Sequence, residues 1–579
     1  MSQNTAAGFR LSTQQERLWS QQAGTAAPFW AECEVRVEGP VDAAKLQEVI
    51  RGVVQRHEIL RTVFHRQTGL KLPFQVVLET PEFAWHVADL TGLEEAAQSE
   101  KERALISSRE SAIDLEHGPT LHVVLARLAS QKHALVLSLP ALCADMRALQ
   151  NLASEIGRAY AGGLEEADEV MQYADVAEWQ QELLASDETK AGRDFWRDYC
   201  RKIDFSALDS VLSSFEKKSA SDFLTDAVVR QVDDPLLASQ SNESLHDFLL
   251  ACWQVFLSRM TGRPGITVGC QFDGRSYTEL ANTLGVLSKY LPLESVCSVG
   301  TTFQSVLDQV QRESAEFRNW QDSFSWNTTG IPAGDEQGPI LPLAFDFAEL
   351  PSDQSFGNLK FTILRQEADG ERFRLKLSAR RQGDRVRLEF HFDAGSLDCT
   401  TIDRWNTHFL TLVAAAAANP ETLTSRLPLL DATVRQRLLV DWNQTAADYP
   451  RDRCMHELFE AQADRTPDLP ALRYEDECLT YRQLNERSNQ LAHYLRSKGV
   501  GADLLVGVCV DRGAGMMVAV LAILKAGGAY VPLSAEHPKP RLMQQLAGVA
   551  VLLTEAKFEC LMPSFGGPVI LLDSDREQW

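Results

Sequence analysis

Residues 139–147, Leu-Pro-Ala-Leu-Cys-Ala-Asp-Met-Arg, contain two side chains that could do chemistry, Cys143 and Asp145. A thiolate near a helix N-terminus can act as a nucleophile or a base, and a carboxylate can accept a proton or hold a cation. The apolar neighbours Leu142 and Ala144 are also typical of a cysteine that serves as a small buried hydrophobic residue. Asp145 precedes a helical pattern, where Asp is a favoured N-cap, so we expect it to cap or to form an ion pair rather than to catalyse directly.

Three histidines lie near the elements that lead to this segment. His57 stands between Arg56 and Glu58, which is more typical of a salt-bridged core residue than of a general base. His122 and His133 lie on or beside predicted strands, and strand alternation alone does not place either side chain in a cavity. The sequence therefore does not point to a histidine base.

Alternating strand and helix patterns predict an α/β fold that positions these residues. The first set of elements comprises strands at 31–38, 121–128 and 134–139 and a helix at 42–55. After a polar helical stretch at 187–201, the second set comprises strands at 226–232, 266–270, 373–379 and 386–392 and helices at 244–260 and 400–417. Two similar α/β lobes are therefore expected.

Composition limits the classes of function. At 579 residues the chain is long enough for three or four domains, and it contains no apolar run long enough to cross a bilayer. A net charge of −23 disfavours nucleic-acid binding through phosphate neutralisation. The eleven cysteines form no Cys-x-x-Cys pair, which favours reduced thiols over disulfides or a zinc site, and residues 1–8 lack the pattern of a signal peptide. We expect a cytoplasmic protein that binds no metal, nucleic acid or membrane.

Four motifs carry a family resemblance: Leu11-Ser-Thr-Gln-Gln-Glu-Arg-Leu-Trp19, Arg56-His-Glu-Ile-Leu-Arg-Thr-Val-Phe64, Tyr173-Ala-Asp-Val-Ala-Glu-Trp179 and Gln321-Asp-Ser-Phe324. In order and spacing they resemble the core motifs of nonribosomal peptide synthetase condensation domains. The resemblance implies two chloramphenicol-acetyltransferase-like lobes in a V-shaped arrangement, with an N-terminal lobe at 1–180 and a C-terminal lobe at 181–430.

The resemblance fails at the catalytic motif. The family has two adjacent histidines followed by Asp-Gly, and here Pro140 and Ala141 occupy the histidine positions while Asp145 is retained. Neither replacement can exchange a proton through its side chain. In the family the aspartate pairs with an arginine across the lobe, and Gly274-Arg275 matches the element that supplies this partner. We therefore expect an Asp145–Arg275 salt bridge that keeps the scaffold while the chemistry is changed.

Two further departures predict an altered tunnel lining. The family's Asn-Thr-Leu-Pro segment reads Lys289-Tyr-Leu-Pro292, and residues 340–346 replace an Arg-rich motif. Pro140 also stands where the heterocyclisation subfamily carries an aspartate, which disfavours that reaction. Two functions remain: an atypical condensation domain that joins an acyl thioester to a carrier-bound amine or hydroxyl, and a catalytically silent carrier-docking module. Both imply upstream and downstream carrier domains with phosphopantetheine arms as partners, together with the rest of the synthetase, and no covalently bound cofactor.

The C-terminal quarter resembles a different domain. Leu479-Thr-Tyr-Arg-Gln-Leu484 and Leu524-Lys-Ala-Gly-Gly-Ala-Tyr-Val-Pro-Leu533 resemble the first two core motifs of an amino-acid adenylation domain. This implies a linker at 431–453 and the N-terminal part of an adenylation α/β subdomain at 454–579. The phosphate loop, ribose-binding aspartate and catalytic lysine of that family do not occur in these residues. We expect exposed apolar surface here and no aminoacyl-AMP formation.

Overall fold

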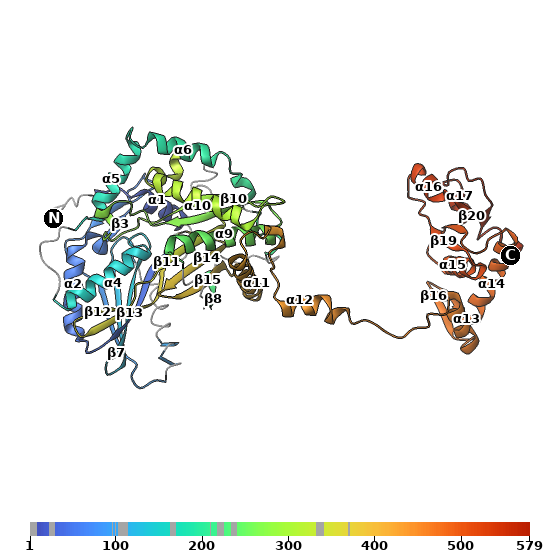
Figure 1. The fold of residues 1–579 in the computed structure, drawn as a ribbon, viewed down its shortest axis with the longest axis horizontal. Coiled ribbons are helices and arrows are strands. Elements are labelled where there is room, and N and C mark those ends of the chain that lie inside the picture. Colours follow the sequence, from blue (N-terminus) through green and yellow to red (C-terminus); the bar gives the residue numbers. More distant parts are fainter. Residues whose placement is uncertain are drawn as a thin grey trace. The chain divides into compact units, whose positions relative to one another are not determined.

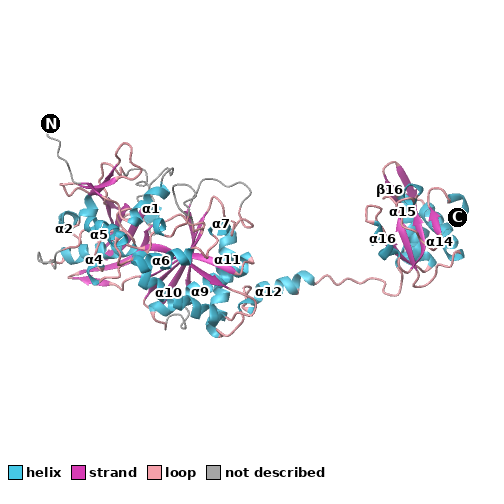
Figure 2. Ribbon diagram, turned by 90° about the horizontal axis from the view of Figure 1, so that it is seen from above, coloured by secondary structure: helices cyan, strands magenta, loops and turns pink. Residues whose placement is uncertain are grey.

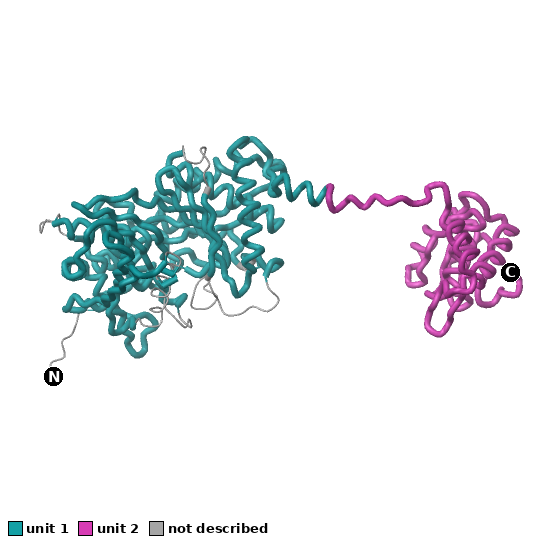
Figure 3. The backbone as a smooth tube through the Cα atoms, turned by 90° about the horizontal axis from the view of Figure 1, so that it is seen from below, with its two compact units in different colours: residues 1–439 teal, residues 440–579 magenta. Residues whose placement is uncertain are grey.

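The computed structural model describes residues 8–22, 29–94, 97–98, 100–101, 114–162, 170–208, 210–216, 225–232, 240–331, 341–368 and 371–579. The predictions for residues 1–7 and for residue 340 lie outside these ranges. The chain forms two compact units, Met1–Leu439 and Val440–Trp579 (Figure 3). Each unit is described below by itself.

The first lobe of unit 1 is built on a six-stranded sheet with strand order β12-β13-β2-β7-β6-β5. The strands are β2 (Trp30–Glu38), β5 (Ala84–Asp89), β6 (His122–Ala129), β7 (Lys132–Pro140), β12 (Gln354–Phe356) and β13 (Leu359–Ala368). β7 is buried along almost its whole length because it lies inside the sheet, between β2 and β6, and its register pairs Pro140 with Trp30. This pairing places the end of β7 beside the first residue of β2.

Helices and a small sheet complete the first lobe (Figure 1). The helices are α1 (Thr13–Gln22), α2 (Ala43–Arg56), α4 (Met146–Tyr160) and α5 (Tyr173–Ala185), and the small sheet has the order β1-β4-β3 with strands at Gly8–Phe9, Phe74–Val77 and Thr62–His65. α4 buries Leu149, Leu152 and Ile156 along one stripe, spaced three and four residues apart, as an amphipathic helix should. It packs against α2 and the strands β2 and β13.

The second lobe also contains a sheet with helices packed against it (Figure 2). The strand order of this sheet is β10-β9-β11-β14-β15-β8. Its strands are β8 (Thr225–Val232), β9 (Gly265–Phe272), β10 (Lys289–Val296), β11 (Leu343–Glu349), β14 (Leu375–Gln382) and β15 (Arg385–Asp393). Its helices are α6 (Lys190–Cys200), α7 (Phe205–Leu208), α9 (Asn242–Thr261), α10 (Phe303–Trp320) and α11 (Cys399–Ala418). α9 is buried on nearly every side because it lies between the sheet, α10 and α11.

The two lobes exchange chain segments. β12 and β13 follow β11 of the second lobe in sequence, yet β13 pairs with β2 and β12 pairs with β13, so both extend the first sheet. Leu284, Val286 and Leu287 also belong to the core of the first lobe. Residues on the C-terminal side of position 180 therefore contribute both strands and core side chains to the first lobe, so the lobes are not two consecutive stretches of sequence.

Unit 2 contains a parallel sheet of order β19-β18-β20-β21 and a hairpin. Its strands are β16 (Pro470–Tyr474), β17 (Glu477–Thr480), β18 (Leu505–Cys509), β19 (Ala529–Pro532), β20 (Val549–Thr554) and β21 (Val569–Leu571), and its helices are α13 (Met455–Arg465), α14 (Tyr481–Ser497), α15 (Ala514–Ala526), α16 (Lys539–Leu546) and α17 (Ala556–Glu559). The unit exposes large apolar side chains, among them Tyr474, Tyr530 and Met543. Residues 435–455, which include the end of α12 (Ala432–Leu439), are exposed throughout.

No helix among the described ranges combines the length and the apolar character that a membrane span requires.

Candidate active site

The motif segment is a tight turn between a buried strand and a helix. β7 ends at Pro140, and α4 begins at Met146. The Asp145 side chain caps α4 by accepting a hydrogen bond from the Ala148 N–H at 2.8 Å. The Ala141 N–H donates to the Phe29 carbonyl at 2.8 Å, which continues the pairing of β7 with β2 by one residue. Strand, turn and cap together hold residues 141–145 in one conformation.

Asp145 and Arg275 form a buried bidentate ion pair. Arg275 donates from Nη1 to Asp145 Oδ2 at 2.9 Å and from Nη2 to Oδ1 at 3.0 Å, and both side chains are at most 3% exposed. The N–H groups of Leu287 and Ser288 also donate to Oδ2, at 2.9 and 3.0 Å. Burial would raise the pKa of Asp145, but the Arg275 charge and these hydrogen bonds hold that pKa below its usual value.

The Asp145 carboxylate is therefore saturated. With the α4 cap it accepts five hydrogen bonds, which exceeds the roughly four lone-pair positions that a carboxylate offers. No lone pair is left to take a proton from a substrate. The structure gives Asp145 a positioning role and not that of a general base.

Gly274 places Arg275 beneath the motif. Gly274 has a φ of 72°, and a Cβ added there would lie 2.0 Å from the Leu287 carbonyl oxygen. Only glycine combines that backbone conformation with so close an approach. The Gly274 N–H also donates to Gln321 Oε1 at 3.2 Å, so the Gly-Arg element is tied to η3 (Gln321–Ser323).

Side chains from two of the recognised motifs hold the loop 285–288, a role that the sequence did not assign to them. Tyr173 donates its hydroxyl to the Val286 carbonyl at 2.6 Å and lies 2.8 Å from the Ser12 hydroxyl. Gln14 donates to the Leu287 carbonyl at 3.2 Å. The loop thus presents the Val286 and Leu287 carbonyls to α5 and α1, and the Leu287 and Ser288 N–H groups to Asp145. Membership in the Leu11–Trp19 and Tyr173–Trp179 motifs was the only signal that could have found these residues.

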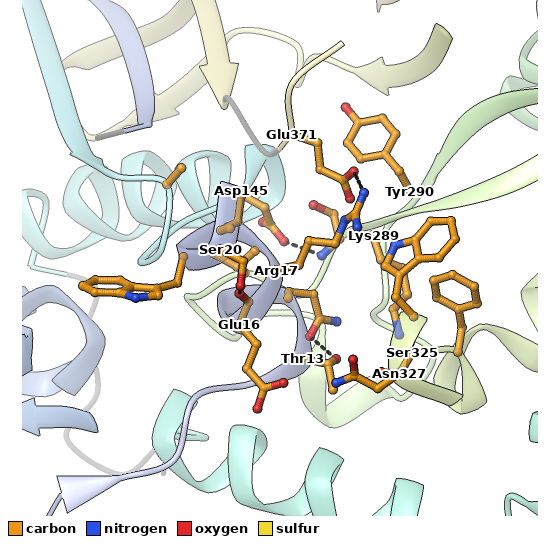
Figure 4. A pocket seen from close by; sticks show the side chains of 18 of the residues that line it. Thr13, Glu16, Arg17, Ser20, Asp145, Lys289, Tyr290, Ser325, Asn327 and Glu371 are labelled. Atoms are coloured by element: carbon orange, nitrogen blue, oxygen red, sulfur yellow. Dashed lines mark hydrogen bonds and ion pairs between the residues drawn. The ribbon is translucent and has the colours of Figure 1, made fainter. Parts of the chain in front are cut away.

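A cavity of about 580 Å³ opens beside the motif (Figure 4). Ala141, Ala144 and Asp145 line it from the first lobe, and Ser288, Lys289 and Tyr290 from the second. Aromatic rings of Trp19, Phe324 and Trp326 form part of its apolar wall. None of the described residues that line the cavity is a histidine.

The other candidate groups from the sequence lie away from this cavity. Cys143 is fully buried, does not line the cavity, and burial raises the pKa of its thiol. Both observations argue against Cys143 as a nucleophile or base, since neither a substrate nor a charged thiolate is accommodated there. His57 Nε2 lies 2.7 Å from Glu155 Oε2 in the core, and neither His122 nor His133 lines the cavity.

An ion pair spans part of the cavity wall. Arg17 on α1 contacts Glu371 at 2.8 Å, and both side chains are less than a tenth exposed (Figure 4). The Arg17 guanidinium also lies 4.8 Å from the centre of the Trp326 ring. The pair joins the first helix to the segment that follows β13, on the side of the cavity that Trp326 lines.

Lys289 is a titratable residue that lines the cavity. The sequence marks it only as a departure from a family motif. It is the first residue of β10, and its ammonium donates to the Gln321 carbonyl at 2.8 Å. Burial lowers the pKa of Lys289 to about 8, and the charge of Asp322 offsets part of this effect.

Fold and site define a two-lobed α/β protein with a cavity between a strand-to-helix motif and a loop of the opposite lobe. The family model "Condensation domain" matches residues 7–439, and the model "AMP-binding enzyme" matches residues 459–576. The chain belongs to the condensation-domain family, and this domain is followed by the start of an AMP-binding domain. The family membership and the α/β fold class predicted from the sequence are confirmed.

Curated relatives are much longer than this chain. Gramicidin S synthase 2 of Aneurinibacillus migulanus is 30% identical over 94% of this chain and 12% of its own length. Tyrocidine synthase 3 of Brevibacillus parabrevis is 31% identical over 97% of this chain and 9% of its own length. The chain thus spans about a tenth of the length of these relatives.

Two solved structures show the same fold. A four-domain nonribosomal peptide synthetase, solved with AMP and glycine bound, superposes with a TM-score of 0.76 at 16% identity, covering 98% of this chain and 45% of its own. The starter condensation domain of rhizomide synthetase superposes with a TM-score of 0.64 at 17% identity, covering 73% of this chain and 98% of its own. At such identities the likeness concerns the fold alone.

Proposed function

We propose that this chain is an atypical condensation domain of a nonribosomal peptide synthetase, which joins a carrier-bound acyl thioester to an amine or hydroxyl acceptor without the motif histidine. One observation carries the proposal. The Asp145–Arg275 scaffold is complete, and the cavity beside it is open at Ala141, where the family carries the second histidine. Burying two charges is unfavourable, so the Asp145–Arg275 pair is expected where the conformation of the motif segment is needed for function.

Positioning can supply most of the rate in this reaction. Holding an amine and a thioester carbonyl in attack geometry is worth up to roughly 7–11 kcal/mol, whereas a placed base adds about 10²–10⁴-fold. In the proposal, upstream and downstream carrier domains deliver the two reactants on phosphopantetheine arms into the cavity between the lobes. The carriers belong to the rest of the synthetase, and the chain itself holds no covalent cofactor.

A second candidate is a catalytically silent module that docks carriers and orders the assembly line. The observation that favours it is the absence of histidine among the described residues that line the cavity. Under this hypothesis the carrier domains bind, and the acyl group stays on the phosphopantetheine arm of the upstream carrier domain.

A condensation assay with loaded upstream and downstream carriers, read by intact-protein mass, separates the two. We expect product from the wild type and from Cys143→Ala, because Cys143 does not line the cavity. Ala141→His should keep the rate or raise it by up to about 10²–10⁴-fold. No product from any of the three, with carrier binding shown separately, would favour the docking module. Loss of product only in Cys143→Ala would make the thiol the working group.

The domain limits and the compartment also remain proposals. We infer a linker at 431–453 from the continuous exposure of residues 435–455, and an adenylation subdomain from 454 onward. The cytoplasm is the proposed compartment, supported by eleven cysteines that are all free.

A further inference from the structure

The charged groups around the cavity differ in how they are neutralised. Asp145 is saturated by Arg275 and three backbone N–H groups, and Arg17 is paired with Glu371. Lys289 has no ion pair with any carboxylate in the described part of the chain. Its ammonium donates to one neutral acceptor, the Gln321 carbonyl, which accounts for one of its three N–H groups.

The backbone places Lys289 next to the motif. Ser288, its immediate neighbour, donates its N–H to Asp145 at 3.0 Å, and Lys289 then begins β10 in register with Phe272 of β9. The backbone of Lys289 therefore lies between the Ser288–Asp145 hydrogen bond and the pairing of β10 with β9. Figure 4 shows Lys289 and Asp145 among the side chains around one cavity, and Ala141 lines that cavity too.

This environment raises the fraction of Lys289 that is present as the neutral amine. Partial burial removes water from the ammonium, and a single carbonyl replaces little of that hydration, so the pKa of Lys289 falls to about 8. The opposing charge is Asp322 on η3. Glu16 and Lys71 also line the cavity, while the Asp145–Arg275 and Arg17–Glu371 pairs are each close to neutral overall. A group that titrates near the working pH is suited to proton transfer.

We propose that Lys289 is the proton acceptor of this domain, taking over from a different element the role that the motif histidine has in the family. The proposal rests on the proposed condensation function. The acceptor amine attacks the thioester carbonyl, the new C–N bond forms, and the C–S bond breaks with its electron pair leaving on sulfur. The proton released from nitrogen passes to the neutral Lys289 amine and then to the departing thiolate, so the products are an amide and a thiol.

Other groups near the cavity fit this role less well. Asp145 has no free lone pair, and Cys143 does not line the cavity. The Tyr290 hydroxyl donates to Asp346 at 3.3 Å, and burial raises the pKa of Tyr290 well above its usual value. The hydroxyl therefore stays protonated near neutral pH and cannot accept a further proton.

The first experiment measures the amine itself. Competitive acetylation of the full chain with acetic anhydride across pH 6–11, read by peptide mass spectrometry, gives the titration of each lysine. We expect Lys289 to titrate near 8, below the value of about 10.4 for a lysine side chain in a model peptide. A Lys289 that titrates at the model-peptide value would overturn the proposal.

The second experiment measures turnover with Lys289→Met, Lys289→Arg and the control Lys132→Met. Methionine keeps the length of the side chain and arginine keeps the charge, but neither accepts a proton in this range. We expect kcat to fall by about 10²–10⁴-fold in both Lys289 variants, with KM for the carriers nearly unchanged. Rescue by Lys289→Arg would show that a fixed charge suffices, and would overturn the base role.

The pH profile separates this role from structural damage. With an acceptor amine of low pKa, which stays neutral throughout, wild-type kcat should rise through pH about 8 and level off, and the Lys289→Met profile should be flat. Equal profiles would overturn the proposal. If the wild type makes no product although both carriers bind, the proposed condensation function is wrong. The proposed role of Lys289 as a proton acceptor is then wrong too, whatever its acetylation shows. The acetylation result does not depend on turnover, so the two failures are distinguishable.

Discussion

The Asp145 carboxylate and the Arg275 guanidinium face each other through two parallel hydrogen bonds, although 130 positions separate them in the sequence. The pair joins the helix cap of the first lobe to the Gly-Arg element that follows β9. Both side chains are almost fully buried, and Arg275 also pairs with the more exposed Asp273, so it is the Asp145 carboxylate that depends on this pair for its neutralisation. The pair therefore couples the motif segment to the opposite lobe.

Removing one partner should be costly. Asp145→Ala removes the cap of α4 and leaves the buried Arg275 guanidinium with the more exposed Asp273 as its remaining carboxylate partner, and we expect the free energy of unfolding to fall by on the order of 3–5 kcal/mol. Urea titrations followed by tryptophan fluorescence measure this loss. A matched control is Asp403→Ala, which breaks the ion pair between Asp403 and Arg230. Both of these side chains are nearly half exposed. The control should cost roughly 0–1 kcal/mol. Equal losses in the two variants would contradict the prediction.

Tyr173→Phe tests the clamp on the loop 285–288. The substitution keeps the ring but leaves the buried Val286 carbonyl without its hydroxyl donor, which should cost about 1–3 kcal/mol. Because this loop supplies two N–H groups to Asp145, we also expect turnover to fall while carrier binding is kept. The control is Tyr449→Phe, since Tyr449 is 66% exposed and its loss should change stability by less than about 0.5 kcal/mol. A wild-type unfolding curve for Tyr173→Phe would exclude the clamp.

Local patterns were enough to predict much of the fold. The alternation at 31–38 corresponds to β2, whose residues alternate between buried and partly exposed, and the apolar stripe at 42–55 corresponds to α2. The role of Asp145 as a helix cap follows from the local preference of Asp for N-cap positions. Its pairing with Arg275 follows from the family motif. Both depend on residues whose types and order are visible in the sequence.

Long-range pairing was not visible. Nothing in the pattern of residues 354–368 indicates that β12 and β13 join the sheet of the first lobe, because strand periodicity determines which side chains face inward but not which strand is the neighbour. The sequence shows Lys289 as a motif departure but does not predict that it titrates, because Gln321 and other lining residues distant in the sequence make its environment. Burial, and the pKa shift it causes, follow only from the assembled structure.

Gly274→Ala should disturb the site without removing any polar group. A methyl group there would lie 2.0 Å from the Leu287 carbonyl oxygen, at a φ that alanine adopts only with strain. We expect a loss of at least about 1 kcal/mol in stability and a larger relative loss of turnover, because Arg275 follows directly and would shift. Gly383→Ala is the control. Gly383 has a similar φ of 62° with no atom within 4 Å of the added Cβ, so only the backbone strain remains. Equal effects would show that the close approach to Leu287 is unimportant.

The pH dependence of stability should depend on Glu389 in the second lobe. Burial would raise the pKa of Glu389, but His391, Arg380 and Arg387 outweigh it and lower that pKa from 4.5 to about 2. A carboxyl with a lowered pKa contributes stability above its unfolded pKa and loses that contribution as the pH falls through the folded value. This difference corresponds to on the order of 3 kcal/mol at neutral pH.

Glu389→Gln should therefore unfold at a lower urea concentration than the wild type at pH 7, with the gap closing between pH about 4.5 and 2. The gap closes because a protonated Glu389 and a glutamine are both neutral. Glu48→Gln, on the exposed side of α2, is the control and should differ from the wild type by less than about 0.5 kcal/mol at every pH. Urea titrations at pH 7, 5, 4 and 3 provide the comparison. A gap that stays constant across this range would show that the ionisation of Glu389 does not stabilise the fold.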